Sequence, residues 1–357
     1  MTHVWDVPVH DSTRVRDVRV AVESAAGHIG LDEERTADAA LVATELATNL
    51  LKHAGGGQIL IDVVDAYLGP APAGRISVVQ IVALDHGPGI VDPAAALGDG
   101  YSTASSLGAG LGTCRRIADE FELHSSPGRG TVALARVHGA RSIKVPRHDA
   151  HTGLPVRAGG VNIPFAGAEV SGDAWAWVPG ADRLTLLVAD GLGHGPAAAL
   201  ASDAAVRELH RSAHLSPPEL LAQLHTALRD TRGAAVAVAQ LDLAERSLSF
   251  SGIGNIGARL RTGDTWRALL SHPGIVGAHR PARVPHLQVP WAPDSLLVLH
   301  SDGLPGRWVP PDAVPHGSPD PAVTAAAIVR DSSSSALPVR DDTTVVVLSP
   351  TLPDRRP

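Results

Sequence analysis

Two aspartate–glycine turns, each placed directly after an apolar run, constrain this chain more than any other feature of its sequence. The first is LTLLVADGLGHG at 184–195, which contains Asp190, and the second is LLVLHSDGLPG at 296–306, which contains Asp302. Short apolar runs bounded by turn residues are typical of buried strands. Two buried strands that carry carboxylates to one sheet edge would form a site for hard divalent cations, which prefer oxygen ligands.

Two further acidic segments extend this pattern. SGD at 171–173 ends in Asp173, and RDDTT at 340–344 contains Asp341 and Asp342. A single aspartate–glycine pair at the end of a strand is usually only a turn. Four acidic segments in one half of the chain instead indicate a converging set of carboxylates. They predict a hydrolase that activates water between two metal ions.

Composition restricts the remaining possibilities. The chain has 357 residues, which suggests two domains. Its net charge of −7, without any basic block, argues against nucleic acid as the main partner. The single cysteine, Cys114, rules out a disulfide within the chain and fits a reducing cytoplasm. The chain has neither a basic start followed by an apolar run nor a stretch of about 18 apolar residues, so we expect a cytoplasmic protein without a secretion signal or a membrane span.

Residues 1–137 are predicted to form the first unit. Apolar residues at helical spacing predict a helix at about 12–28, and a second helix follows Asp32, a favourable N-cap residue, and runs to about His53. Glycines at 55–57 end this second helix. The other expected elements are strands at 58–64, 76–85 and 131–137 and a helix at 110–121.

Residues 138–158 are polar, contain glycine and proline, and show no periodicity, so they are predicted to be a linker. The second unit then covers 159–350, and we expect the tail at 351–357 to be disordered. The expected elements of the second unit are strands at 184–189, 235–241, 247–251, 257–261, 296–300 and 344–349, with helices at 196–212 and 216–229.

The first unit carries residues suited to binding a nucleotide. Glu45 and Asn49 lie four residues apart, which places them on one helical face, where Asn can offer oxygen to Mg²⁺ and Glu can polarise a hydroxyl group. In DHGPGI at 85–90, Asp85 follows a strand and can accept a hydrogen bond from an exocyclic amine. SLGAGLG at 106–112 opens a helix, where free backbone N–H groups can hold phosphates.

These segments, together with GRGT at 128–131, occur in the order typical of the GHKL-type ATP-binding domain, which residues 12–137 resemble. The chain is similar to the RsbT-like serine kinases and the anti-sigma-factor kinases of bacterial partner-switching modules. The resemblance implies an N-terminal α/β sandwich of the Bergerat type that binds ATP with Mg²⁺. It also implies that Glu45 is the general base toward a protein serine, that Asn49 binds Mg²⁺, and that Asp85 binds the adenine amino group. The other implied nucleotide contacts are Gly87, Gly89 and Thr131 near the adenine, and Gly108, Gly110, Leu111 and Gly112 in the lid and phosphate cradle.

The second unit resembles the SpoIIE/RsbX-like branch of the type 2C (PPM) serine/threonine phosphatases, through SGD, VADG, HSDG and RDD in family order. The resemblance covers 160–349 and implies a C-terminal β-sandwich flanked by helices, with two Mn²⁺ or Mg²⁺ ions. The segment GDAWAWV departs from many relatives, because it lacks a second acidic residue after GD.

The same resemblance implies the ligands of these two ions. Asp190 would bridge both ions, and the carbonyl of Gly191 would be a further ligand. The remaining implied ligands are Asp173 for one ion, and Asp302 and Asp341 for the other. RDD also allows a shift of one residue, which would make Asp342 the ligand in place of Asp341.

Together the two resemblances imply an α/β two-domain chain with opposed activities. The first unit would phosphorylate a serine or threonine, and the second would remove such a phosphate, on a STAS-domain anti-sigma-factor antagonist or another phosphoprotein. Another class of function is also open: the ATP-binding unit is a non-catalytic binding module, or a nucleotide sensor that regulates the phosphatase. The choice between Mn²⁺ and Mg²⁺ and the oligomeric state stay open.

Overall fold

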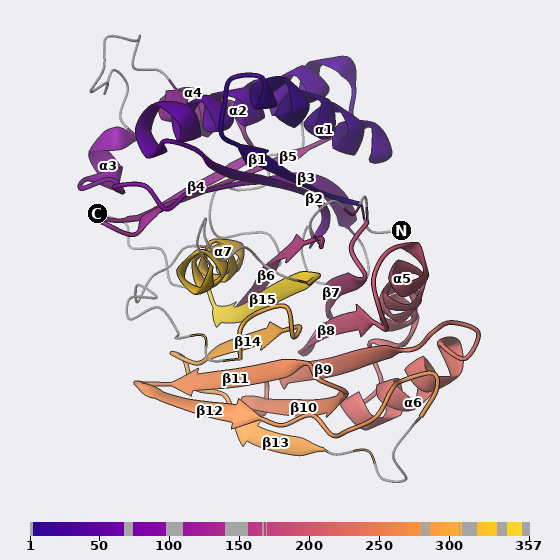
Figure 1. The fold of residues 1–357 in the computed structure, drawn as a ribbon. Coiled ribbons are helices and arrows are strands. Elements are labelled where there is room, and N and C mark those ends of the chain that lie inside the picture. The colour runs from indigo at the N-terminus through magenta and orange to yellow at the C-terminus, as the bar shows by residue number, and fades with distance from the viewer. Residues whose placement is uncertain are drawn as a thin grey trace.

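The computed structural model shows the chain as a stack of helix and sheet layers (Figure 1). It describes residues 3–67, 74–97, 110–139, 156–165, 168, 170–279, 284, 286–306, 308, 320–333 and 341–351. The N-terminal unit is one five-stranded sheet with its long helices on one face, and the C-terminal unit is a pair of five-stranded sheets with helices on both outer sides. The predicted two-domain architecture, an α/β sandwich followed by a helix-flanked β-sandwich, is therefore confirmed.

The N-terminal sheet is antiparallel throughout and has the order β1-β2-β3-β5-β4. One face of this sheet forms a closed core with the helices, built almost entirely from Val, Ala, Ile and Leu. The strands are β1 (Val4–Val9), β2 (Gly57–Tyr67), β3 (Arg75–Leu84), β4 (Glu120–Ser126) and β5 (Gly130–His138). The helices are α1 (Arg14–His28), α2 (Glu33–Asn49), the π-helical turn η1 (Leu50–Ala54), α3 (Pro93–Ala96) and α4 (Gly110–Ile117).

Local sequence explains where the second helix begins and ends. Asp32 caps α2 as predicted, because its carboxylate accepts a hydrogen bond from the Arg35 N–H at 2.7 Å. After Asn49 the helix widens into η1, a π-turn of the kind often found beside functional sites. Gly55 ends it in the left-handed conformation, at φ 74°, which glycine adopts without strain.

Two strands correct the sequence prediction in this unit. The helix expected at 110–121 ends at Ile117, because β4 begins at Glu120 and pairs with β5 over its whole length. β1, which was not predicted, pairs with β2 from Val4 to Val9. Both segments become strands because a distant partner strand supplies the hydrogen bonds, which overrides local propensity.

The C-terminal unit packs two antiparallel sheets face to face, in the orders β13-β10-β9-β8-β7 and β12-β11-β14-β15-β6. Its six predicted strands and two predicted helices are all confirmed. The strands are β6 (Val156–Ile163), β7 (Asp173–Pro179), β8 (Arg183–Gly191), β9 (Ala234–Asp242), β10 (Ser247–Ile253), β11 (Gly257–Thr262), β12 (Thr265–Leu269), β13 (Leu287–Pro290), β14 (Leu296–His300) and β15 (Thr343–Pro350). The helices are α5 (Pro196–Ser212), α6 (Pro217–Ala227) and α7 (Pro321–Ser332). None of the helices in the described residues is both long and apolar enough to cross a membrane.

The segment predicted as a linker is strand at both of its described ends. β5 extends to His138, and β6 begins at Val156 and pairs with β15 up to Ile163. Two glycines of β6 directly follow the predicted linker, and both lie in tight packing. A Cβ at Gly159 would lie 2.8 Å from the backbone N of Ala322 in α7, and one at Gly160 would lie 2.7 Å from the carbonyl of Val345.

α7 lies between the two units and belongs to the packing of both (Figure 1). Every residue from Pro321 to Arg330 is buried. One core cluster joins α7 to Val132 and Leu134 of the N-terminal sheet and to Val161 of β6. The N-terminal sheet therefore has two buried faces, one under α1, α2 and α4 and the other on α7 and the C-terminal unit.

A buried ion pair fixes the start of α7 against the N-terminal sheet. Arg136 of β5 donates to Asp320 through Nη1 at 2.6 Å and Nη2 at 3.1 Å, and to Glu120 at 2.7 Å. Asp320 is also the N-cap of α7, because it accepts from the Ala322 N–H at 2.8 Å. Gln80 completes the contact: its Oε1 accepts from Arg136, and its Nε2 donates to the carbonyl of Gly160 at 3.0 Å.

We expect Arg136→Met to lower the free energy of unfolding by about 3–5 kcal/mol, because removing one partner of a buried ion pair leaves the other charge uncompensated. Urea titration followed by circular dichroism measures this loss. Arg183→Met is the matched control, since Arg183 is 54% exposed and pairs with Asp242 at the surface, and its loss should cost about 1 kcal/mol or less. Equal losses in the two variants would contradict the structural role of the Arg136 pair.

Asp62 of β2 gives the interface between the units a dependence on pH. It lies on the same face of β2 as Leu60, which belongs to the core shared with α7. Its carboxyl is buried, with no hydrogen-bond partner for Oδ1 among the described residues, and burial raises its pKa to about 7. The folded protein therefore keeps a proton on Asp62 over a range where the unfolded chain has released it.

Stability should consequently fall as pH rises from about 4 to 7, because the folded state binds more protons than the unfolded state in this window. We expect Asp62→Asn to remove this part of the pH dependence. At pH 8 the variant should be more stable than the parent by up to about 4 kcal/mol, at about 1.4 kcal/mol per pKa unit, and at pH 4 the difference should vanish. Urea unfolding at several pH values tests this, and parallel profiles for the two proteins would contradict it.

Candidate functional site

The strand register brings two of the predicted metal ligands together. Asp173 is the first residue of β7, and Asp190 is the residue before the last in β8. The two are directly opposite each other in the antiparallel β7–β8 pair, so their side chains point to the same face of the sheet. A hairpin between the SGD segment and the VADG segment is therefore what unites them.

Asp173 forms the floor of this cluster. Its side chain is fully buried, and neither carboxylate oxygen has a hydrogen-bond partner among the described residues. Burial raises the pKa of Asp173 well above its usual range, and the nearby carboxylate of Asp190 raises it further. The hydroxyls of Ser301 and Thr344 lie close by and partly offset this rise. A buried carboxylate without donors is costly unless a cation binds it, so this residue fits a metal ligand.

Asp190 lies at the electrostatic centre of the cluster. Burial, together with the negative charges of Asp302, Asp341 and Asp342, raises its pKa to about 7. Like charges gathered around one residue destabilise each other, and a divalent cation would relieve that repulsion. Asp302 and Asp341 are exposed, so the cluster runs from a buried floor to an open rim.

The two adjacent aspartates of RDD have different surroundings. Asp342 is buried, and its two oxygens accept backbone N–H bonds from Phe165 at 2.8 Å and from Gly172 at 2.9 Å. It therefore ties the SGD segment to β15. Asp341 is exposed, and its Oδ1 accepts only from the N–H of Asp342 in the described contacts, at 2.9 Å.

Tight backbone packing holds the other predicted ligands in place. Gly191 donates its N–H to the carbonyl of Gly172 at 3.1 Å, and a Cβ at Gly191 would collide with the backbone of Ala198 in α5. Asp302 accepts a hydrogen bond from Nδ2 of Asn255 at 2.7 Å. The close approach of α5 therefore requires glycine at position 191, whether or not the carbonyl of Gly191 binds a metal ion.

The convergence of four acidic segments on a metal site stays a prediction. The register and the mutual charge effects place Asp173, Asp302, Asp341 and Asp342 around Asp190. Among the residues that the structure describes, however, no group of three or more His, Cys, Asp or Glu side chains is arranged to hold a metal ion. The carboxylates are neighbours that repel one another, and they would have to turn inward around a cation.

The N-terminal unit brings Glu45 and Asn49 against the first turn of α4. A Cβ at Gly110 would lie 3.2 Å from Oε2 of Glu45 and 3.3 Å from Oδ1 of Asn49, so a side chain there would press against both groups. Nδ2 of Asn49 is buried and has no hydrogen-bond partner in the described part of the chain. Glu45 and Asn49 thus share one face of α2, as predicted, and face the start of the lid helix.

Asp85 lies at the end of β3 in a pocket of backbone donors. Its Oδ1 accepts from the N–H of Gly87 at 2.8 Å and from the N–H of Thr131 at 3.2 Å. Burial raises its pKa, and these two hydrogen bonds oppose the rise. Gly89 has φ 72°, and a Cβ there would collide with the carbonyl of Ser126, so the DHGPGI loop lies directly on the β4–β5 turn.

The predicted lid is described only in part. Gly108 lies outside the described residues. Leu111 packs against the N-terminal core and Gly112 is buried in α4. Cys114 is buried with its thiol 3.8 Å from the carbonyl of Val42, and burial raises the pKa of this thiol, which agrees with a packing role for the residue.

Sequence reasoning missed several residues that surround these two sites. Asn255, Ser301 and Thr344 contact or flank the acidic cluster, yet no motif marks them as partners of aspartates far along the chain. Ser301 directly precedes Asp302 and Thr344 lies two residues after Asp342, and this nearness in sequence is the one signal that could have identified them. Arg330 of α7 reaches the N-terminal site and carries no signal at all.

Comparison with known proteins matches each unit to a family. Residues 180–350 match the family described as Stage II sporulation protein E (SpoIIE), and residues 9–136 match the family described as histidine kinase-like ATPase domain. The serine/threonine-protein kinase RsbT of Bacillus subtilis (strain 168) is 43% identical over 99 residues, which is 27% of this chain and 69% of RsbT. The N-terminal unit of the chain belongs to the RsbT-like serine/threonine kinase family, and the C-terminal unit is a SpoIIE-type PPM phosphatase domain. Both predicted resemblances are thus confirmed.

Two solved structures are also similar. RsbX in complex with magnesium has a TM-score of 0.46 at 20% identity, over 54% of this chain and 94% of that chain. The phosphatase domain of SpoIIE from Bacillus subtilis with a fragment of its regulatory domain has a TM-score of 0.46 at 18% identity, over 96% of this chain and 97% of that one. Since both TM-scores lie below 0.5, the family assignment rests on the sequence matches.

The acidic cluster predicts a specific response to divalent ions. In EDTA, Asp173→Asn should raise the melting temperature, because it removes a buried, unpaired carboxylate beside Asp190. The parent should gain stability on addition of Mn²⁺ or Mg²⁺, by about 2.7 kcal/mol at one hundred times the dissociation constant, and the variant should gain much less. Thermal denaturation with and without each ion measures both effects.

Asp182→Asn is the control for this experiment. Asp182 is exposed in the turn at the opposite end of the same hairpin. Its substitution should therefore change neither the melting temperature in EDTA nor the stabilisation by added ions. A parent protein that shows no stabilisation by either ion would contradict the metal site.

Proposed function

We propose that the chain is a partner-switching regulator that both adds and removes a phosphate on serine or threonine of a regulatory protein. The N-terminal unit would use ATP with Mg²⁺ as a serine/threonine kinase, and the C-terminal unit would use two Mn²⁺ or Mg²⁺ ions as a phosphoserine/phosphothreonine phosphatase. A STAS-domain anti-sigma-factor antagonist, or another phosphoprotein, would be the substrate. The observation that carries the proposal is the 43% identity to RsbT in one chain with a SpoIIE-type domain.

The kinase role is supported by the arrangement of Glu45 and Asn49 at the start of α4. Asn49 would hold Mg²⁺ through its side-chain oxygen, which lies beside Gly110. Glu45, on the same face of α2, would accept the proton of the attacking hydroxyl as general base. Oδ2 of Asp85 would accept a hydrogen bond from the adenine amino group, since Oδ1 already accepts hydrogen bonds from two backbone N–H groups.

The phosphatase role is supported by the acidic cluster. Asp173, Asp190, Asp302 and Asp341 would hold the ions with the carbonyl of Gly191. Two bound ions would lower the pKa of an attacking water and neutralise the phosphate charge. Of the two adjacent aspartates, we propose Asp341 as the ligand, because both oxygens of Asp342 already accept backbone N–H groups.

One feature favours a second candidate, in which the N-terminal unit is a nucleotide sensor for the phosphatase. Its DHGPGI loop contacts the end of α7, since Nε2 of His86 donates to the carbonyls of Arg330 at 2.8 Å and Ser333 at 3.1 Å. The chain continues from this point to Asp341. Nucleotide binding that moves the loop would then change the geometry of the acidic cluster without any kinase turnover.

Incubation of the full chain with [γ-³²P]ATP, Mg²⁺ or Mn²⁺ and a STAS-domain protein tests the proposal. The parent should leave little label at steady state, because the phosphatase removes it. Asp190→Asn should accumulate label on the STAS protein, and Asp190→Asn combined with Glu45→Ala should accumulate none. Asp182→Asn, in the exposed turn, should behave as the parent.

The two candidates give opposite results in this assay. A sensor predicts no label in any variant, together with a rate of phosphopeptide hydrolysis that changes when ATP is added. Label in Asp190→Asn that survives Glu45→Ala would contradict the role of Glu45 as general base.

A further inference from the structure

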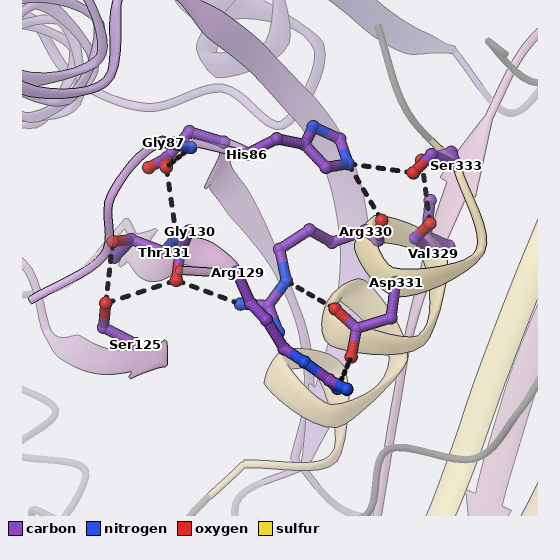
Figure 2. Close-up of polar contacts among 11 residues, drawn as sticks. His86, Gly87, Ser125, Arg129, Gly130, Thr131, Val329, Arg330, Asp331 and Ser333 are labelled. Atoms are coloured by element: carbon purple, nitrogen blue, oxygen red, sulfur yellow. Dashed lines mark hydrogen bonds and ion pairs between the residues drawn. The ribbon is translucent and has the colours of Figure 1, made fainter. Parts of the chain in front are cut away.

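The C-terminal end of α7 lies directly against the nucleotide loop of the N-terminal unit (Figure 2). Arg330 is fully buried there, although 244 residues of sequence separate it from His86 of this loop. Its Nη1 donates to the carbonyl of Gly130 at 3.3 Å, and its Nε donates to Asp331 at 2.9 Å. A residue of the phosphatase unit thus borders the predicted adenine site of the kinase unit.

The contact of Arg330 reaches Asp85 through a single peptide group. The carbonyl of Gly130 and the N–H of Thr131 are the two ends of that peptide. The carbonyl accepts from Arg330, and the N–H donates to Oδ1 of Asp85 at 3.2 Å. A cation on the carbonyl oxygen polarises the peptide and strengthens the N–H as a donor, because hydrogen bonds in a chain reinforce one another at low dielectric.

The peptide is held from several sides, which makes its orientation well defined. The hydroxyl of Ser125 also donates to the carbonyl of Gly130, at 3.2 Å, and shares a hydrogen bond with Oγ1 of Thr131 at 2.9 Å. Asp85 donates its own N–H to the carbonyl of Thr131 at 3.0 Å. Arg330 is the one charged group in this set besides Asp85.

The charge of Arg330 also acts on Asp85 directly. Burial raises the pKa of the Asp85 carboxyl, and the charges of Arg330 and His86 are among the effects that oppose this rise. An ionised Asp85 can only accept hydrogen bonds, which is the state suited to an exocyclic amine. Without Arg330, the carboxylate would be left with weaker backbone donors in the same buried place.

We propose that Arg330, a residue of the phosphatase unit, is a positioning residue of the nucleotide site: it holds the Gly130–Thr131 peptide that orients the Asp85 carboxylate, and so sets the preference for adenine. This rests on the proposed nucleotide function of the N-terminal unit. Recognition of adenine is then divided between the two units, with Asp85 contacting the base and Arg330 acting through the peptide.

The test compares ADP with inosine diphosphate, which carries an oxygen in place of the 6-amino group. Isothermal titration of the full chain in Mg²⁺ gives the affinity ratio of the two nucleotides. The parent should prefer ADP strongly, since a site built to accept an N–H group rejects an analogue without it. Arg330→Gln should lower this preference at least about tenfold, chiefly by weakening the binding of ADP. A tenfold change corresponds to about 1.4 kcal/mol.

Two further variants separate positioning from folding. Arg330→Lys keeps the charge without the planar fork of the guanidinium, and should give an intermediate preference. Arg129→Gln is the matched control. Arg129 is 54% exposed, and in the described contacts it forms an ion pair only with Asp331 across the same interface. The ADP preference of this variant should therefore equal that of the parent. If Arg330→Gln does not fold, the ADP preference of Arg330→Lys alone tests the proposal.

Each outcome has a definite meaning. A lower preference for ADP with unchanged affinity for inosine diphosphate supports the proposal. An equal loss for both nucleotides shows that Arg330 only maintains the fold, and an unchanged preference shows that it has no role at Asp85; either result overturns the proposal. A parent that binds nucleotides without discriminating them would refute the adenine role of Asp85 itself, and a parent that binds neither would refute the proposed function.

Discussion

The burial of α7 between two sheets is the constraint on which the rest of the structure depends. A helix that is apolar on every side needs a cover on every side, and each unit supplies one half of it. This explains why β6 carries two glycines where α7 and β15 approach, and why a buried ion pair joins Asp320 at the start of the helix to Arg136 of the other unit. The same packing places Arg330, at the end of the helix, beside the nucleotide loop.

Most of the fold could be predicted from the sequence because most elements have one apolar face and one polar face. The helices at 14–28 and 196–212 show this stripe, and the long strands show short apolar runs between turn residues. α7 is buried on every side from Pro321 to Arg330 and has no stripe of exposed polar residues there, so periodicity could not reveal it. The strands at 4–9 and 120–126 depend on distant partners that local propensity does not encode.

The site was predictable to the extent that its residues lie in short motifs. Asp173 and Asp190 were expected together, and the register of one hairpin places them opposite each other. The difference between Asp341 and Asp342 could not be read from the sequence, because it depends on which carboxylate accepts the backbone N–H groups of Phe165 and Gly172. Motifs identify side chains that can do chemistry, whereas the contacts that orient them come from residues made neighbours only by folding.

The shared core around α7 has a consequence for how such a protein is used by a cell. Two proteins that oppose each other can usually be balanced by changing how much of each is made or destroyed. Here each unit covers an apolar face of the other, so unfolding of either unit would expose apolar surface of the other to water. Because one chain carries both units, their ratio is fixed at one to one, and it cannot be changed by making or destroying one of them alone.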